Sequence, residues 1–408
     1  MKITVYRPNQ IGGCVTEIES SSGTRIIIDV GSNLPGIGSE PVNVKELAKG
    51  CAGVFITHYH GDHIGEYKKI HEGTPVYIGR QAKEIFYTLQ ERLSKKSEYT
   101  KVEQSDLKTI QKFIPYGQGD IIDLGDLTIT PVRADHSAYD SHMLLVSDGE
   151  KSVLHTGDFR THGWAGETMT DSIKKYAGKV TALICEGTML SRSSNRIYSE
   201  NDLYEDAKKL LEDNRNVFVL CSSTNIDTIA SFYRAAQETK RLVVADGYQR
   251  SVLDVVSENA ENPLYVMKKV KVYWPNRQDC VEKMRSMGFC MFIRAKPVFA
   301  DALKLFPGNL IVYSMWEGYL EENKPYSDTE KIDFLNWAKS DENVKSKVKC
   351  LHTSGHAYEE AIIELCDTIR PDIIFPIHSE KPDRFETLDS GSIRGKVTRL
   401  KDKVSVSI

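Results

Sequence analysis

Residues 58–63 carry three imidazoles and one carboxylate at HxHxDH spacing. Imidazoles and carboxylates are ligands for divalent metal ions, and a single ion would leave some of these donors idle. The apolar run Val54–Ile56 precedes the motif, so we expect the ligands at the carboxyl end of a buried strand, with Asp62 or His63 opening a helix. A surface turn rich in histidine is the alternative, but this density of donors at ligand spacing favours a two-metal site.

Two later strand patterns each end in a further donor. His136 follows the pattern at 127–132, and Asp158 follows the pattern at 153–155. One predicted set is His58, His60 and His136, and the other contains Asp62, His63 and one further histidine. Asp158 can then bridge the two cations, as in hydrolases that generate hydroxide at neutral pH. Alone, His136 would be read as a core histidine, and the first motif is what favours a ligand role.

Composition sets the class of molecule. The 408 residues are 40% hydrophobic and 27% charged, which is typical of a soluble globular chain of two or three domains. No apolar run approaches the ~18 residues of a membrane span, so we expect a cytoplasmic protein. A net charge of −4 means that nucleic-acid binding would need a local patch. The eight cysteines form no CxxC pair, and we interpret them as reduced core thiols.

The hydrophobic pattern divides the chain into three regions. Short strand patterns dominate up to about residue 195, except at 81–113, where apolar residues recur at helical spacing. Strand and helix patterns alternate from 196 to 345, which favours a parallel α/β insert. Short strand patterns, among them 349–351 and 397–400, return towards residue 408.

Seven motifs, in this order, resemble the metallo-β-lactamase superfamily and its β-CASP branch, the nucleases that include RNase J. The resemblance rests on Asp29 in IIDVG, the motif THYHGDH, His136, Asp158, Glu186 in CEGT, His356 in SGHA and His378 in PIHS. It implies an α/β fold, a metallo-β-lactamase αββα sandwich with an inserted α/β β-CASP domain. Residues 1–195 would form the first part of the metallo-β-lactamase domain, 196–345 the β-CASP insert and 346–408 the return segment.

The resemblance also implies a substrate and cofactors. His378 would complete the second metal set, and a histidine here, where several DNA-directed members have valine, favours RNA. Two divalent cations are expected, Zn²⁺ first and Mn²⁺ as the alternative. Single-stranded RNA is the expected partner, no membrane is expected, and the oligomeric state is left open, a homodimer included.

Glu186, His356 and Asp29 also have a chemical rationale. The SGHA turn precedes a helix pattern, where Ser354, Gly355 and backbone amides can hold a phosphate oxygen and His356 can protonate the leaving oxygen. Glu186 would orient His356, and Asp29 would orient a ligand histidine. The candidate catalytic residues are Asp62, His356 and Glu186. The plainer alternatives are a solvated loop carboxylate for Glu186 and a turn residue for Asp29.

Two further stretches are candidates for substrate binding. Ser223, Thr224 and Asn225 join a strand pattern to a helix pattern, resembling the turn that holds RNA phosphate in RNase J-like enzymes, although a plain helix cap would look the same. The basic and aromatic stretch 264–300 is either a strand-binding groove or, as we prefer, a solvated face over core aromatics. The segment 313–319 reads YSMWEGY where RNase J enzymes usually have a GSQGEP turn.

These observations favour a metal-dependent phosphodiester hydrolase acting on RNA, an exo- or endoribonuclease of the RNase J type. Hydroxide would attack between two divalent cations, with His356 as the general acid. One alternative is a small-molecule hydrolase of thioesters, lactones or nucleotides on the same fold, but such substrates need neither the insert nor the SGHA motif. The other is a non-catalytic RNA-processing subunit, which would not need the full ligand set.

Overall fold

The computed structural model describes residues 1–95, 104–192 and 196–408. The chain divides into two compact units. The first unit comprises Met1–Ile197 and Gly355–Ile408, and the second unit comprises Tyr198–Ser354. The predicted boundary at residue 195 lies outside the described residues, and the insert 196–345 stays a prediction.

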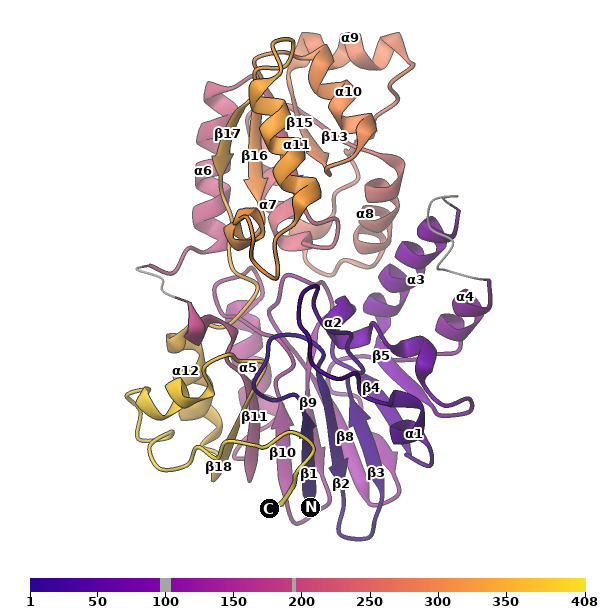
Figure 1. Cartoon of the computed structure of the whole chain (residues 1–408), viewed down its shortest axis with the longest axis vertical. Helices are drawn as coiled ribbons and strands as arrows, with labels where there is room; N and C mark the ends of the chain where they lie inside the picture. Colours follow the sequence, from indigo (N-terminus) through magenta and orange to yellow (C-terminus); the bar gives the residue numbers. More distant parts are fainter. Residues whose placement is uncertain (96–103, 193–195) are drawn as a thin grey trace. The chain divides into compact units, whose positions relative to one another are not determined.

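Two sheets pack face to face in the first unit (Figure 1). Within the described ranges, the larger sheet has seven strands in the spatial order β19 (Ser405–Ser407), β1 (Lys2–Tyr6), β2 (Val15–Glu19), β3 (Arg25–Ile28), β4 (Gly53–Ile56), β5 (Val76–Gly79) and β6 (Ile114–Tyr116). The other sheet has six described strands, in the order β18 (Ile373–Ile377), β11 (Ala182–Glu186), β10 (Ser152–His155), β9 (His142–Ser147), β8 (Leu127–Arg133) and β7 (Ile122–Leu124).

Alternating apolar residues build the core between these sheets. Ile3 and Ile18 from the larger sheet share one fully buried cluster with Leu144 and Val146 of the smaller sheet. Side chains in a strand alternate between its two faces, so such residues fill the space between the layers while their neighbours point outwards.

Helices cover the outer faces of both sheets. α5 (Gly166–Tyr176) and α12 (Glu359–Ile369) pack Ile173 and Leu365 against Leu154 and Leu183 of the smaller sheet. On the other side lie α1 (Val44–Ala48), α2 (Gly61–Ile64), α3 (Arg80–Ser94) and α4 (Gln104–Gln111). The predicted αββα sandwich is confirmed. The helical segment predicted at 81–113 is described as α3 and α4, and its part at 96–103 lies outside the described residues.

The second unit is built on a parallel sheet. Its six described strands are β14 (Lys271–Val272), β13 (Leu242–Ala245), β15 (Phe289–Ile293), β12 (Asn216–Cys221), β16 (Leu310–Ser314) and β17 (Lys347–Cys350), in that spatial order. The helices are α6 (Glu200–Asp213), α7 (Ile226–Glu238), α8 (Gly247–Asn259), α9 (Gln278–Met287), α10 (Pro297–Leu305) and α11 (Thr329–Ser340). The four central strands, β13, β15, β12 and β16, are nearly all apolar because helices bury both faces of a parallel sheet. This is the alternation that the sequence predicts.

Two late strand patterns have a different outcome from the one expected. Residues 349 and 350 of the pattern at 349–351 belong to β17, which pairs with β16 in the second unit. The pattern at 397–400 forms only an isolated bridge between Val397 and Ile374, and no strand. Instead, the last strand, β19, pairs with β1.

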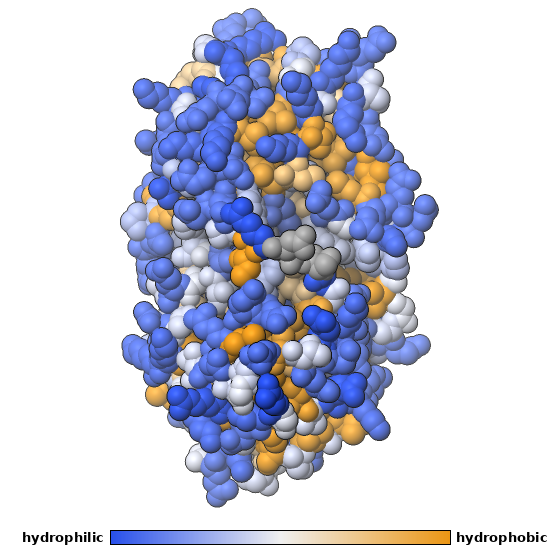
Figure 2. Space-filling view, turned by 90° about the vertical axis from the view of Figure 1, so that its left-hand side faces the viewer, coloured by the Kyte–Doolittle hydropathy of each residue, from blue (hydrophilic) through white to orange (hydrophobic). Residues whose placement is uncertain are grey.

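Polar and charged residues cover most of the face drawn in Figure 2, with smaller hydrophobic areas between them. No helix in the described ranges has both the length and the hydrophobicity needed to cross a membrane.

Candidate metal centre

The predicted ligands of the first unit follow strand ends of both sheets. After β4, His60 caps the short helix α2, which contains Asp62 and His63. His136 follows β8, Asp158 follows β10, Glu186 ends β11 and His378 follows β18. Since β10, β11 and β18 run parallel, their carboxyl ends meet at one edge, the usual place for a site in such sheets.

His58, His60 and His136 form the first set of donors. His60 Nδ1 lies 3.2 Å from both His58 Nε2 and His136 Nε2. Tetrahedral zinc with Zn–N bonds of about 2.05 Å places neighbouring nitrogens about 3.3 Å apart. The observed spacing is therefore that of three ligands around one ion.

Burial keeps these three rings neutral. It lowers the pKa of His58 well below its ordinary value, and the neighbouring imidazoles add to the effect. Burial likewise lowers the pKa of His60 to about 4 and depresses the pKa of His136. Only a neutral imidazole can offer a lone pair to a metal, so the environment favours the ligating form.

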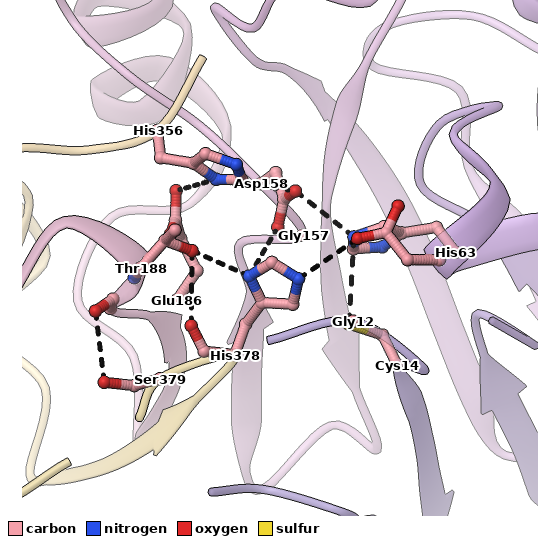
Figure 3. A network of polar contacts seen from close by, with 12 residues as sticks. Gly12, Cys14, His63, Gly157, Asp158, Glu186, Thr188, His356, His378 and Ser379 are labelled. Atoms are coloured by element: carbon pink, nitrogen blue, oxygen red, sulfur yellow. Dashed lines mark hydrogen bonds and ion pairs between the residues drawn. The ribbon is translucent and has the colours of Figure 1, made fainter. Parts of the chain in front are cut away.

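Asp62, His63, Asp158 and His378 form the second set, and their ligand atoms all lie within 4.8 Å of one another. His63 Nε2 is 3.2 Å from Asp158 Oδ2, and His378 Nε2 is 3.4 Å from Asp62 Oδ2 (Figure 3). Burial alone would lower the pKa of His378, but Asp158, Cys14 and Asp62 raise it well above its ordinary value. The carboxylates of this set thus attract positive charge, which a divalent cation can supply in place of protons.

Asp158 lies between the two sets. Its Oδ2 is 3.2 Å from His63 Nε2 and 3.9 Å from His58 Nε2, one member of each set. The residue is 3% exposed, and its Oδ1 has no hydrogen-bond partner within the described part of the chain. Leaving a buried polar atom unpaired costs roughly 1–3 kcal/mol, and more for a charged group. The side chains therefore fit a dinuclear cation centre in which Asp158 is shared.

Hydroxyl and carbonyl groups behind the rings fix their orientation. Thr188 Oγ1 lies 2.7 Å from His378 Nδ1, and the Gly355 carbonyl oxygen lies 2.5 Å from His136 Nδ1. A partner on Nδ1 sets the tautomer and leaves Nε2 to face the metal. Sequence reasoning gave Thr188, the last residue of the CEGT motif, no role of its own, because a threonine there does not indicate which ring it will contact. Gly355, predicted to bind phosphate, offers its carbonyl oxygen to His136.

Glu186 is fully buried, so it is not a solvated loop carboxylate. Its Oε1 accepts hydrogen bonds from the amides of Ala357 and Phe159, and its Oε2 accepts one from the Thr188 amide. The Nδ1 atom of His356 lies 3.2 Å from Glu186 Oε1 and 3.6 Å from Asp158 Oδ2. Three backbone amides therefore hold Glu186 in place, and His356 lies beside it, next to the metal sets.

Cys14 is a further group at the site that sequence reasoning missed. The residue is only partly buried, and its Sγ lies 3.7 Å from His63 Nε2. The prediction of a core thiol is wrong for Cys14, because the turn before β2 brings it to the ligand cluster. Its position after two glycines was the one available signal.

Ser223, Thr224 and Asn225 lie in the second unit, at the start of α7. Asn225 Oδ1 accepts a hydrogen bond from the Thr228 amide at 3.2 Å, so Asn225 is the N-cap of the helix. Arg294 Nη1 donates to Ser223 Oγ at 3.0 Å. The turn is thus a helix cap with a guanidinium beside it, and its role in phosphate binding stays a proposal.

The basic and aromatic stretch 264–300 packs mostly inwards. Tyr265, Tyr273, Phe289 and Phe292 are buried, whereas Trp274 is 55% exposed. The interpretation preferred from the sequence is a solvated face over core aromatics. It holds for four of these five rings. In the departing segment 313–319, Tyr313 and Ser314 end β16 and are buried.

Comparison with known proteins identifies the family. The metallo-beta-lactamase superfamily model matches residues 15–168, and the Zn-dependent metallo-hydrolase RNA specificity domain matches residues 341–386. Residues 15–168 therefore form a domain of the metallo-β-lactamase superfamily. Over most of its length the chain is similar to ribonucleases J.

Curated relatives and a solved structure agree with this placement. Ribonuclease J of Helicobacter pylori (strain ATCC 700392 / 26695) is 23% identical over 406 residues, which cover 91% of this chain and 55% of the relative. Ribonuclease J of Mycoplasma pneumoniae is 24% identical, with coverage of 87% and 63%. A protein of unknown function from Enterococcus faecalis V583 has a similar fold, with a TM-score of 0.72, 19% identity and 99% of both chains covered. The chain spans little more than half the length of the first of these relatives.

Proposed function

We propose that this protein is a metal-dependent phosphodiester hydrolase that acts on RNA. The observation that carries the proposal is the position of Asp158. Its Oδ2 faces both metal sets and lies 3.6 Å from His356 Nδ1, so a candidate proton donor stands beside the candidate metals.

The first cation would be held by His58, His60 and His136, and the second by Asp62, His63 and His378, with Asp158 shared. When bound, two such ions polarise a phosphoryl oxygen and supply hydroxide at neutral pH. We propose Zn²⁺ for both positions, with Mn²⁺ as the alternative, because imidazole-rich sets suit zinc. Asp62 is proposed to act catalytically through its place in this ligand shell.

His356 is proposed as the general acid. In this proposal Nδ1 of His356 donates a hydrogen bond to Glu186 Oε1, so Nε2 faces the substrate. Nε2 would then pass a proton to the leaving oxygen. Glu186 is proposed as the positioning carboxylate, since four contacts, three of them from backbone amides, hold it in place. Asp29 is proposed to orient His63 in the same manner.

RNA is proposed as the substrate on two grounds. The relatives that match are named ribonuclease J, and residues 341–386 match a domain described by RNA specificity. Ser223, Thr224 and Asn225 in the second unit, and Ser354, Gly355 and His356, are the proposed phosphate-binding residues. The domain limits proposed are 1–195 and 346–408 for the catalytic domain and 196–345 for the β-CASP insert.

A three-substrate assay tests the proposal. The purified protein, with zinc or manganese added, is incubated with 5′-labelled single-stranded RNA, with a thioester and with a lactone. Hydrolysis of RNA alone is the expected result, and product length then separates cutting from the 5′ end from internal cutting. Hydrolysis of the thioester or lactone with intact RNA would move the protein to the small-molecule class. If the protein binds the RNA but leaves it uncut, and hydrolyses neither of the other two compounds, it would be a binding subunit.

A further inference from the structure

The turn before β2 holds Cys14 rigidly against the metal centre. The Cys14 amide donates to the Asp62 carbonyl oxygen at 2.9 Å, and its own carbonyl accepts from the Gly31 amide at 2.9 Å. Gly13 precedes it with a φ of +69°, a conformation that glycine adopts without strain. A Cβ at Gly31 would lie 1.7 Å from the Asp62 carbonyl oxygen, so only glycine allows this close approach. The backbone of Cys14 is therefore tied directly to the predicted ligand turn.

The thiol of Cys14 points at two predicted ligands of the second cation. The ligand atoms of Cys14, His63 and His378 all lie within 4.8 Å of one another. Its Sγ is 3.7 Å from His63 Nε2, the same nitrogen that faces Asp158 (Figure 3). Zinc bonded to sulfur at about 2.3 Å and to nitrogen at about 2.05 Å separates the two atoms by about 3.55 Å in a tetrahedron. The observed distance is close to that value.

A second observation, independent of the cysteine, points to an ion at the same place. Asp158 is only 3% exposed. Its Oδ1 has no hydrogen-bond partner among the described residues and lies 3.6 Å from His378 Nδ1. Cys14, His63 and His378 form one group of potential ligands, and Asp62 and Asp158 form a second group with the same two histidines. His63 Nε2 faces both the sulfur of Cys14 and the carboxylate of Asp158.

We propose that Cys14 supplies a thiolate ligand to the second cation and makes that position selective for zinc over manganese. Sulfur is a soft donor that suits zinc, whereas manganese prefers carboxylate, carbonyl and water oxygens. As the sulfur–metal bond forms, the thiol proton leaves to solvent, so no oxidant or reductant is needed. The inference rests on the metal centre of the proposed function, but not on RNA being the substrate.

Cobalt is the probe, because a thiolate bound to Co²⁺ gives a charge-transfer absorption in the near ultraviolet that imidazole and carboxylate ligands do not give. The metal-free protein is titrated with Co²⁺ in buffer without added thiols. We expect the band to develop in the parent protein, to be absent in Cys14→Ser and Cys14→Ala, and to be retained in Cys280→Ser. Cys280 is the matched control, since it is partly buried in the second unit, where its Sγ faces the Val272 carbonyl oxygen.

Competition between Zn²⁺ and Mn²⁺, followed by metal analysis, gives the second readout. In Cys14→Ser the preference for zinc at one of two sites should fall about tenfold or more, as removal of groups from a metal site commonly does. Circular dichroism of both variants verifies that they fold.

The outcomes separate this inference from the proposed function. Two bound cobalt ions without the band, or a band that survives in Cys14→Ser, would overturn the Cys14 assignment and leave the metal centre intact. A parent protein that binds no metal would overturn both. Bound metal with the Cys14-dependent band, but no RNA cleavage, would overturn the RNA proposal alone.

Discussion

His63 Nδ1 lies 2.7 Å from Asp29 Oδ2, and both side chains are buried. Asp29 also accepts hydrogen bonds from the amide and the hydroxyl of Thr57, at 2.8 and 2.9 Å. The backbone of Asp29 is left-handed, with a φ of +61°, which aspartate tolerates better than most residues. Asp29, which follows β3, thus contacts both Thr57 at the start of the ligand turn and His63 within it, and we propose that it directs His63 Nε2 towards Asp158.

Asp29→Asn tests this relationship. An asparagine keeps the shape and the left-handed backbone but loses the charge that holds the Nδ1 proton of His63. We expect affinity for the second cation to fall about 10–100-fold, with the first cation little affected. Stepwise metal titration measures both. Asp123→Asn, an exposed carboxylate that accepts from Thr128, is the control. Two unchanged binding steps in Asp29→Asn would show that Asp29 has no orienting role.

Two metal equivalents per chain are expected, because each set supplies three ligands and Asp158 is shared. Asp158→Ala should lose at least one equivalent together with activity, since its Oδ2 faces both sets. Elemental analysis of the parent and the variant, alongside RNA cleavage, provides the test. One equivalent in a fully active parent protein would rule out the dinuclear arrangement.

His356→Ala should keep both metals and slow the chemical step by ~10²- to 10⁴-fold, the usual contribution of a positioned acid. Glu186→Gln should slow the chemical step less, because the side-chain oxygen of glutamine can still accept hydrogen bonds from the backbone amides of Ala357 and Phe159. Single-turnover rates and metal content are measured together, with His71→Ala as the control. Asp158, Glu186, His356 and His378 also form a potential metal cluster, so loss of metal in His356→Ala would make His356 a ligand instead.

Sequence patterns predicted much of the fold because the relevant signals are local. Alternating apolar residues predict the strands of the sandwich, and the strand–helix alternation predicts the parallel sheet of the second unit. The HxHxDH motif is local too. Contacts across long separations are different: Thr188 reaches His378, and Cys14 reaches His63, only after folding. Thr188 ends the CEGT motif and Cys14 follows two glycines, but neither pattern indicates which histidine the side chain will contact.

Acid should weaken the fold through His155. Its Nδ1 accepts a hydrogen bond from the Gly157 amide at 3.0 Å, so the ring proton sits on Nε2, which is 3.1 Å from Thr16 Oγ1. A second proton would face the Gly157 amide. Burial accordingly lowers the pKa of His155 to about 4, whereas an unfolded histidine has a pKa of about 6.5.

The sign of the effect follows from the two pKa values. Between pH 6.5 and 4 the unfolded chain binds the extra proton and the folded chain does not, so this stability is complete above pH 6.5 and is lost as the pH falls towards 4. The loss is of the order of a few kcal/mol. Chemical unfolding of the metal-free protein across this range should show a flatter acid dependence for His155→Gln. Parallel curves for the variant and the parent would contradict the assignment.

The last prediction concerns the 5′ end of RNA. Ser223 Oγ receives a hydrogen bond from Arg294, whose charge is paired with Asp246, and the amides at the start of α7 lie next to it. Such a site has a small positive potential that suits one phosphate and is poorly matched to the larger charge of a triphosphate. Single strands with a 5′-monophosphate should therefore be degraded faster than those with a 5′-triphosphate.

Ser223→Ala combined with Asn225→Ala should erase most of that difference. Because Asn225 caps α7, its loss alone costs roughly 0.5–2 kcal/mol of stability, so Ser223→Ala is also measured by itself. Ser251→Ala, on the neighbouring helix α8, is the matched control. For each protein, the initial rate of degradation is measured on the 5′-monophosphorylated and on the 5′-triphosphorylated RNA, and the first products are identified by length. Equal rates in the parent protein, with internal fragments early, would discard 5′-end recognition and favour endonucleolytic cutting.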